Sequence, residues 1–389
     1  MKIASWLLTA TLFVLVVCSC AKKDITYKIT KKDGVTYIKT LFNGKPAGKM
    51  NLIKTVRFTD EYVNWYLHAS DKKDHLAAVI QKNNLSFLTI WDKELNRIGE
   101  YEIKTGKGPG ELSGWIPGMG MNENSIFFLD NQKTSIEEFD HNMRFKDSYI
   151  FYDVRFRFNY GNTKVHLRNG FFYISPVKNF VAVKTDMNGM MINGIPQEDP
   201  DGVNGFLKNL NEHAADADGN IYLIMIGYEN RYEVRKYDQD LKLVWVNSVD
   251  DGLLNILSSK IVNFPNGSFE LDGGKVATGI ECDGEHIYII RGTNGIAKWK
   301  WENETKVLMQ SPVPGLKNGF VDVFNAQTGM LEYRIDAPFL KTTLRYKLNI
   351  MGDDFYFSAP YSQDNGKNVI PDSNVLLHAV LEPVKNGAK

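Results

Sequence analysis

The sequence predicts an all-β fold in which one four-stranded antiparallel unit recurs around a ring. Short apolar strands bounded by glycine, asparagine or aspartate recur along the chain, as buried strands between tight turns do. After each of them comes a further strand that closes on an aspartate or asparagine turn. No stretch shows a sustained helical period. Together these observations predict a six-bladed β-propeller.

The buried strands that follow tight turns mark the second strand of each blade. Leu76–Ile80 is the corresponding strand of the first blade. The other stretches, each a turn followed by its strand, are Asn122–Asp130, Arg168–Ser175, Asp216–Ile224, Cys282–Ile290 and Met351–Ser358. Six such strands predict six blades.

The turns that close the next strand of each blade set the repeat length. They fall at Asp92, Asp140, Asp186, Asp238 and Asn325, at intervals of 48, 46, 52 and 87 residues. Three of these intervals match one four-stranded unit. The longest interval indicates an insertion from Gly292 to Gly319, and the assignment of strands across residues 239–325 stays open. Leu253–Val262 is the one amphipathic stretch and predicts a short helix in a connection.

The last unit lacks a fourth strand, which would leave an unpaired edge in the ring. The alternating stretch Gly34–Phe42 is expected to supply it, with Ile25–Thr30 pairing alongside. We therefore assign the propeller to residues 34–384 and a tether to residues 20–33.

The N-terminus predicts export. After Lys2, a fifteen-residue, mostly apolar run, Ile3–Val17, leads into Cys18-Ser19-Cys20, which is typical of a signal peptide over residues 1–19 and too short to span a membrane. The arrangement resembles a bacterial lipobox. The resemblance implies cleavage after Ser19, diacylation of Cys20 and a membrane contact through that lipid. Because Ala21 is not aspartate, the enterobacterial sorting rule favours the outer membrane. The alternative is an ordinary secretory signal.

Charge and cysteine content exclude other classes. Lys and Arg number 46 and Asp and Glu number 46, which argues against a nucleic-acid partner. Once Cys18 is removed and Cys20 carries lipid, Cys282 remains alone, so no internal disulfide forms. A lone cysteine in an apolar strand is expected to be a small buried hydrophobe.

The glycine-rich stretch Thr105–Leu112, TGKGPGEL, predicts a sharp turn between two blades. It does not fit a phosphate-binding Walker loop, because Lys107 is followed by glycine and not by serine or threonine. It does not fit a dinucleotide fingerprint either, because Glu111 stands at the third glycine position.

GKGPGEL at 106–112, DGVTYIKT at 33–40 and the repeated Asp/Asn-Gly strands and aromatic-Asp turns resemble the six-bladed β-propeller lipoproteins common in Bacteroidetes. These are relatives of the NHL and TolB-like propellers. The resemblance implies a fold and an envelope location, and it brings no established activity. The chain departs from the pattern at Val183–Asp186, where aromatic-Asp is usual, and at the insertion after Gly292.

The long connections are expected to rim one end of the central channel and to form the binding surface. They are Thr105–Met121, Ile195–Leu210, Asp250–Gly267 and Gly292–Gly319. In RFRFNY, Arg155 and Arg157 share one strand face and are candidates for an anionic ligand. In KWKW, Trp299 and Trp301 share a face on which a sugar can stack, and Trp115 is a comparable candidate. Ordinary strand burial is the preferred explanation of these patterns.

The sequence names no catalytic residue, cofactor or metal ligand. Its histidines show no paired metal-binding spacing, and no Gly-x-Ser-x-Gly elbow occurs. Gln197–Gly202 and Asp216–Gly219 faintly resemble calcium loops, but Asx turns explain them better. We therefore expect a lipid-anchored binding module for a glycan, a peptide or an envelope protein. The alternatives are a structural subunit of a surface complex and a propeller enzyme, of the lyase or lactonase type, with a metal-assisted site at the channel.

Overall fold

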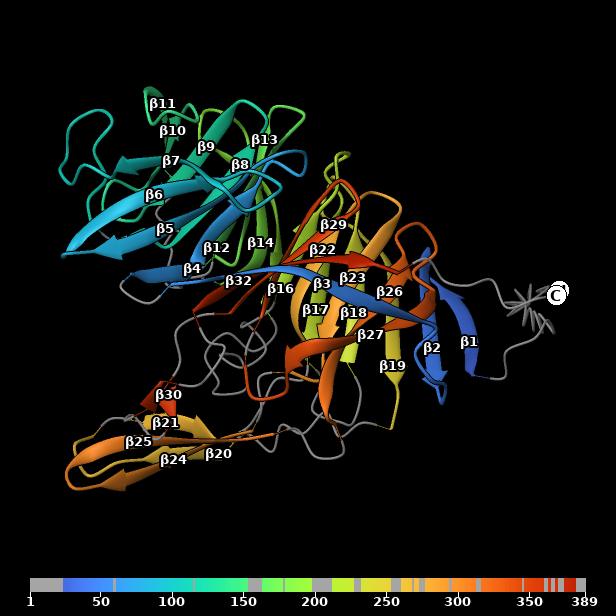
Figure 1. Ribbon diagram of the computed structural model, residues 1–389. Coiled ribbons are helices and arrows are strands. Elements are labelled where there is room, and N and C mark those ends of the chain that lie inside the picture. Colours follow the sequence, from blue (N-terminus) through green and yellow to red (C-terminus); the bar gives the residue numbers. More distant parts are fainter. Residues whose placement is uncertain are drawn as a thin grey trace, which may run out of the picture.

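The computed structural model describes residues 24–58, 61–114, 116–152, 163–177, 179–197, 212–226, 232–252, 260–267, 269–272, 277–293, 296–312, 316–344, 346–359, 363–364, 368–369 and 374–382. Within these ranges every regular element is a β-strand, so the all-β prediction is confirmed (Figure 1). None of the described segments forms a helix with the length and apolar character that crossing a membrane requires.

Strands that follow one another along the chain pair antiparallel in groups of four. The first three groups are β4 (Tyr62–Ser70), β5 (Leu76–Lys82), β6 (Leu85–Trp91) and β7 (Arg97–Glu102); β8 (Gly118–Asn122), β9 (Ser125–Asp130), β10 (Ser135–Phe139) and β11 (Phe145–Ile150); and β12 (Thr163–Arg168), β13 (Phe171–Ser175), β14 (Phe180–Thr185) and β15 (Met191–Pro196). The predicted second strands are confirmed in β5, β9 and β13.

The remaining groups follow the same plan. They are β16 (Glu212–Ala215), β17 (Ile221–Ile226), β18 (Tyr232–Tyr237) and β19 (Leu243–Asp250); β22 (Ala277–Cys282), β23 (His286–Arg291), β26 (Asn318–Asn325) and β27 (Leu331–Lys341); and β28 (Lys347–Met351), β29 (Asp354–Ala359), β32 (Val375–Leu381) and β3 (Gly48–Arg57). The predicted second strands in β17, β23 and β29 are confirmed as well.

The aspartate turns between the third and fourth strands repeat in detail. Oδ1 of Asp140 accepts the backbone N–H groups of Asn142 and Arg144 at 2.8 and 2.9 Å, and Asp186 and Asp238 accept bonds at the same offsets. Each turn then needs a left-handed residue, which is Met143 after Asp140, with φ 58°. The short side chain of aspartate supplies the acceptor that closes such a turn, as the sequence predicts.

The first strands of the groups contact one another in a closed succession. β4 lies between β28 and β8, β8 pairs with β12, and β22 lies between β16 and β28. The rings of His166 in β12 and His213 in β16 lie 5.6 Å apart and join the remaining pair of strands. The first strands therefore surround a common axis, which is the arrangement of a β-propeller.

Two glycines allow neighbouring groups to join into an eight-stranded sheet. In β8, Gly118 and Met119 pair in parallel with Thr163 and Lys164 of β12. A Cβ atom at Gly118 would lie 1.9 Å from the carbonyl oxygen of Thr163, and one at Gly120 would lie 1.8 Å from that of Val165. The backbones can approach this closely only because glycine has no side chain.

The hydrophobic core lies between neighbouring groups. Phe127 of β9 and Phe172 of β13 meet edge to face, with ring centroids 5.7 Å apart, and both side chains are buried. This contact connects the second strand of one group to that of the next. Each sheet therefore buries its faces against its neighbours.

The N-terminal segment closes the ring, but through a different strand from the one expected. β3 pairs antiparallel with β32 and parallel with β27, so it supplies the fourth strand of the last group. The predicted closing stretch forms β2 (Val35–Phe42), which pairs in parallel with β19 instead. The alternation of β2 buries Ile38, Thr40 and Phe42 on one face, which suits the edge of a sheet with one packed face, so alternation alone did not identify the closing strand.

The expected pairing of the two N-terminal stretches is confirmed. β1 (Ile25–Lys32) pairs antiparallel with β2 along its whole length and forms the outer edge of that sheet. Residues 25–32, which the sequence assigns to a tether, are therefore strand.

Three hairpins form what we call the cap. They are β20 (Lys260–Asn263) with β21 (Phe269–Asp272), β24 (Ile296–Glu302) with β25 (Thr305–Ser311), and β30 (Gln363–Asp364) with β31 (Asn368–Val369). β24 contacts β21, β25 contacts β30, and the hairpins gather beside the propeller (Figure 1). The predicted insertion at Gly292–Gly319 is thus a hairpin between the second and third strands of its group. Of the predicted helix, Lys260–Val262 lies in β20 and Leu253–Ser259 lies outside the described residues.

The cap gathers at one end of the propeller. Because strands alternate in direction within a group, the second and fourth strands end on the same side. β24–β25 and β30–β31 follow second strands, and β20–β21 follows a fourth strand. The prediction that long connections gather on one face therefore holds for the described parts of Asp250–Gly267 and Gly292–Gly319, while β30–β31 was not among the predicted connections.

Candidate functional site: the central channel

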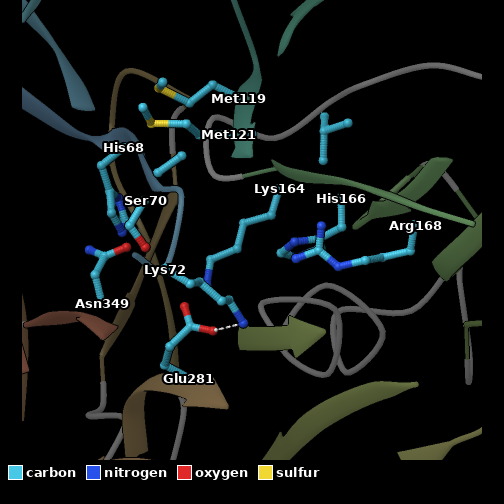
Figure 2. A pocket seen from close by; sticks show the side chains of 13 residues that line it. His68, Ser70, Lys72, Met119, Met121, Lys164, His166, Arg168, Glu281 and Asn349 are labelled. Carbon is cyan, nitrogen blue, oxygen red and sulfur yellow. Dashed lines mark ion pairs between the residues drawn. The ribbon is translucent and has the colours of Figure 1, made fainter. Parts of the chain in front are cut away.

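The channel between the first strands holds a small polar cavity (Figure 2). Its lining comes from β4, β8, β12, β22, β28 and the turn after β4. The space open to water is about 20 Å³, which is room for one or two water molecules. The cavity therefore accommodates a small polar group and not a whole sugar or nucleotide.

Strand β12 contributes three basic side chains to this cavity. Because successive side chains alternate across a strand, Lys164, His166 and Arg168 share the face that looks into the channel (Figure 2). The intervening Val165 is buried against the neighbouring group. None of these residues was predicted from the sequence. The signal was the alternation Lys-x-His-x-Arg in the strand before a predicted second strand.

The basic side chains are held by backbone carbonyls and by one carboxylate. Nζ of Lys72 forms an ion pair with Oε1 of Glu281 at 2.9 Å. Nζ of Lys164 donates to the carbonyl oxygen of His213 at 3.0 Å, and Nε of Arg168 donates to that of Asp216 at 3.1 Å. The described residues of the lining thus carry three cations and one carboxylate.

Burial and the neighbouring cations govern the ionisation of the lining residues. Burial alone would raise the pKa of Glu281, but Lys72 and Lys164 outweigh it and hold that pKa below its ordinary value. Burial lowers the pKa of Arg168. Burial, and then the proximity of His213 and Arg168, holds the pKa of His166 well below 6.5. His166 is therefore neutral near pH 7.

Two polar atoms in the cavity have no hydrogen-bond partner. Nε2 of His166 and Nδ2 of Asn349 are shielded from solvent, and neither bonds to a described residue. A buried polar atom without a partner is costly, and such atoms occur where a water or a ligand completes the bonding. Together with the surplus of cations, these atoms indicate a site for a small anionic group.

Replacement of His166 by glutamine is expected to flatten the pH dependence of stability. Below pH 6.5 the unfolded chain takes up a proton that the buried imidazole does not, so the free energy of unfolding of the parent falls as the pH drops. The contribution is at most about 1.4 kcal/mol per pH unit. Urea unfolding measured from about pH 7 to about pH 5 should show that the free energy of unfolding falls less in the variant than in the parent. Parallel curves for the two proteins would contradict this result.

A second hollow lies between the segment Phe42–Pro46, the residue after β19 and strands β26–β27. Its volume is about 480 Å³. Its floor is a buried ionic network. Nη2 of Arg334 donates to Asp251 at 2.8 Å, and Nε donates to Asp322 at 2.6 Å.

The network is balanced in charge and tightly packed. Arg291 donates to Asp251 at 2.7 Å, and the hydroxyl of Tyr232 donates to Asp322 at 2.5 Å. The guanidinium of Arg334 lies between the rings of Phe42 and Phe320, at 4.3 and 3.8 Å. Two arginines face two aspartates, so this network has no surplus charge and serves to join the sheets.

Most of the residues that the sequence nominated are not described by the structure, so their role in ligand binding stays a prediction. Arg155, Arg157 and Trp115, and the lipidation candidate Cys20, lie outside the described residues. Trp299 and Trp301 both lie in β24 of the cap. The ring of Trp301 lies 5.5 Å from that of Phe264, so Trp301 packs two hairpins of the cap together.

Two sequence expectations about single features are confirmed. Cys282 is buried, and burial raises the pKa of its thiol to about 12, as suits a small hydrophobe.

In the glycine-rich turn, Glu111 accepts the N–H of Gly108 at 2.8 Å, and Lys133 donates to the carbonyl oxygens of Gly108 and Glu111. The turn is closed by its own residues and bridges β7 and β8, as predicted.

Asp216 of the calcium-like stretch Asp216–Gly219 forms the Asx turn that the sequence favours. Its carboxylate accepts bonds from Asn220 and from the hydroxyl of Tyr222. Gln197 donates to the carbonyl oxygen of Val177, and residues 198–202 lie outside the described segments. Across the described part of the chain, no three His, Cys, Asp or Glu residues gather in a way that would hold a metal ion.

No protein-family model matches the chain, and no curated protein matches its sequence. Solved structures do match. A member of the DUF4221 family from Bacteroides vulgatus is 13% identical, with a TM-score of 0.50 over 87% of this chain and 99% of that one. A Bacteroides fragilis protein described as exported is 10% identical over 92% and 96%, with a TM-score of 0.42. The WD40 repeats of RRP9 are 9% identical over 86% and 100%, with a TM-score of 0.46. At such identities, the likeness to the DUF4221 protein concerns the fold alone.

Proposed function

We propose that this protein is an exported, lipid-anchored six-bladed β-propeller that works as a binding module and takes an anionic group of its ligand into the central channel. The observation that carries the proposal is the surplus of cations around the cavity. Among the described residues of the lining, Lys72, Lys164 and Arg168 face one carboxylate, Glu281, and the side-chain nitrogen of Asn349 bonds to none of the described residues. Buried charges are normally paired, so an anion that enters the channel would pair with the cations that Glu281 does not neutralise.

The six-blade assignment is supported by the strand groups. If the eight-stranded sheets are divided at the parallel pairs β8–β12 and β27–β3, every unit is a four-stranded antiparallel sheet. The first strands of these units surround the channel, and β3 completes the last unit. β1 and β2 are then two extra strands on the outer edge of the fourth blade.

The envelope location is supported by the sequence. Residues 1–19 have the pattern of a signal peptide, and Cys20 follows it as the acylated cysteine of a lipobox does. The described fold begins at Asp24, so the propeller would stand close to the membrane that holds the lipid. Ala21 favours the outer membrane.

The size of the cavity limits which part of a ligand can enter it. About 20 Å³ admits a terminal carboxylate or a similar small anionic group, while the rest of the ligand must lie outside the mouth. Peptide C-termini and uronic-acid residues of glycans both present such a group. Lysine, guanidinium and amide N–H donors are the groups that bind carboxylates in proteins.

The test is retention of ligands on glycan and peptide arrays with matched acidic and neutral members. We expect the parent protein to retain acidic members only, and Lys164→Met to weaken that binding at least about tenfold, because a hydrogen bond to a charged group contributes about 1.5–3 kcal/mol. Lys236→Met is the matched control, since Lys236 is a part-buried lysine that also donates to a carbonyl, away from the channel. Retention of neutral members, equal losses in both variants, or no retention at all would contradict the proposal.

A further inference from the structure

The outer face of the β1–β2 hairpin is basic and amphipathic. Residues directly opposite one another in an antiparallel pair share a face. On the outer face Lys28 stands opposite Lys39, Thr30 opposite Tyr37 and Thr26 opposite Leu41. Tyr37 and Leu41 are 38% and 42% exposed, and both lysines are exposed. The other face packs inward, through Ile25 and Ile38.

This face carries positive charge that the protein does not neutralise. Two lysines directly opposite each other repel and destabilise a hairpin. Neither Lys28 nor Lys39 forms an ion pair with a described residue, and the same holds for Lys32, which shares this face at the end of β1. On the neighbouring strand β19, Ser248 lies beside Lys39, and Asp250 lies beside Leu41 at the end of the strand. An external anionic surface would relieve the repulsion.

The position of the hairpin fits a membrane as that surface. Ile25 lies five positions after Cys20, and an extended residue spans about 3.3 Å, so the hairpin begins within about 17 Å of the proposed lipid. β1 is the outermost strand of its sheet, farthest from the first strand β16, and it lies at the outer edge of the molecule (Figure 1). Lysines beside exposed tyrosine and leucine are typical of surfaces that rest on lipid headgroups.

We infer that the outer face of the β1–β2 hairpin docks on the surface of an anionic phospholipid bilayer. Lys28 and Lys39 contact the headgroups, and Tyr37 and Leu41 enter the interface. Because the hairpin extends its sheet outward from the channel, docking leaves both ends of the channel open to ligand. The argument for the membrane as occupant rests on the proposed envelope location, but the docking itself needs no lipid on Cys20.

The experiment measures vesicle binding by the unacylated chain from residue 20 onward with Cys20→Ser, which contains every described strand. At low ionic strength we expect it to co-sediment with phosphatidylcholine vesicles that contain about one third phosphatidylglycerol, and not with phosphatidylcholine alone. Lys28→Glu/Lys39→Glu should lower the partition coefficient at least about tenfold, since each lysine near an anionic surface contributes about 1 kcal/mol. Lys104→Glu/Lys107→Glu makes the same change in charge at two exposed lysines on the β7–β8 connection and should bind as the parent does.

The outcomes separate this inference from the proposed function. Failure to bind anionic vesicles, equal binding to neutral vesicles, or equal losses in both charge-reversal variants would overturn it. A change of oligomeric state in Lys28→Glu/Lys39→Glu by sedimentation velocity would overturn it in favour of a second copy of the chain as occupant. None of these results bears on ligand binding at the channel, which the array experiment tests separately.

Discussion

Replacing Asp322 by alanine is expected to lower the free energy of unfolding by about 3–5 kcal/mol. The change removes the carboxylate that accepts bonds from Arg334 at 2.6 and 3.0 Å and from the hydroxyl of Tyr232. Arg291 and Arg334, whose side chains are only 0% and 7% exposed, would keep their ion pairs with Asp251 but lose the second carboxylate of the network. A buried charge that loses its partner cannot recover its hydration, so the loss is much larger than for a surface pair.

Equilibrium unfolding in urea measures this effect. Glu123→Ala is the control, because it removes the Lys73–Glu123 pair, whose side chains are 61% and 63% exposed. Exposed pairs contribute about 0–1 kcal/mol, so the control should unfold close to the parent. If Asp322→Ala and Glu123→Ala cost the same, the buried network does not hold the sheets together.

Replacing Gly120 by alanine is expected to cost about 3 kcal/mol, the upper end of the range for overpacking. The new Cβ atom would lie 1.8 Å from the carbonyl oxygen of Val165, and backbone cannot move aside as a side-chain tip can. β8 and β12 would have to separate, and the channel lined by Met119 and Lys164 would change with them.

Thermal and urea unfolding measure this cost, with Gly108→Ala as the matched control. At Gly108 a Cβ atom meets only the flexible end of Glu111, at 3.0 Å, and the backbone is not left-handed. We expect the control to change stability by less than about 1 kcal/mol. A Gly120→Ala protein as stable as the control would show that the close approach of the two strands is not required.

The repeat was predictable from sequence because local chemistry determines it. Asp140 and Asp238 close their turns with bonds to residues two and four positions later, and that interaction needs no information from elsewhere in the chain. The closing strand was not predictable in the same way. The sequence indicated β2 as a strand and β3 was not identified, and the partners of both lie in distant sheets, so only the assembled ring shows which of them closes it.

The candidate site likewise combines residues that the local sequence can identify with residues that only the assembled fold brings beside them. Lys164, His166 and Arg168 form a local alternation that a search for polar first strands would find. Their relation to Lys72, Glu281 and Asn349 depends on strands from three other groups. The search for aromatic and cationic residues close together in the sequence pointed to Trp299 and Trp301. In the structure, Trp301 packs two hairpins of the cap together.

The pairing of β3 with β32 sets an order of events during synthesis. Arg57 of β3 pairs with Val375 of β32, so the partner of an early strand emerges from the ribosome 318 residues later. Until then the last sheet is incomplete, and the edge of the early strand stays open to wrong partners. The ring can close only when almost the whole chain has been made. A ribosome that stalls before Val375 would therefore release a chain in which the edge of β3 is unpaired, and quality-control proteases can attack such a chain.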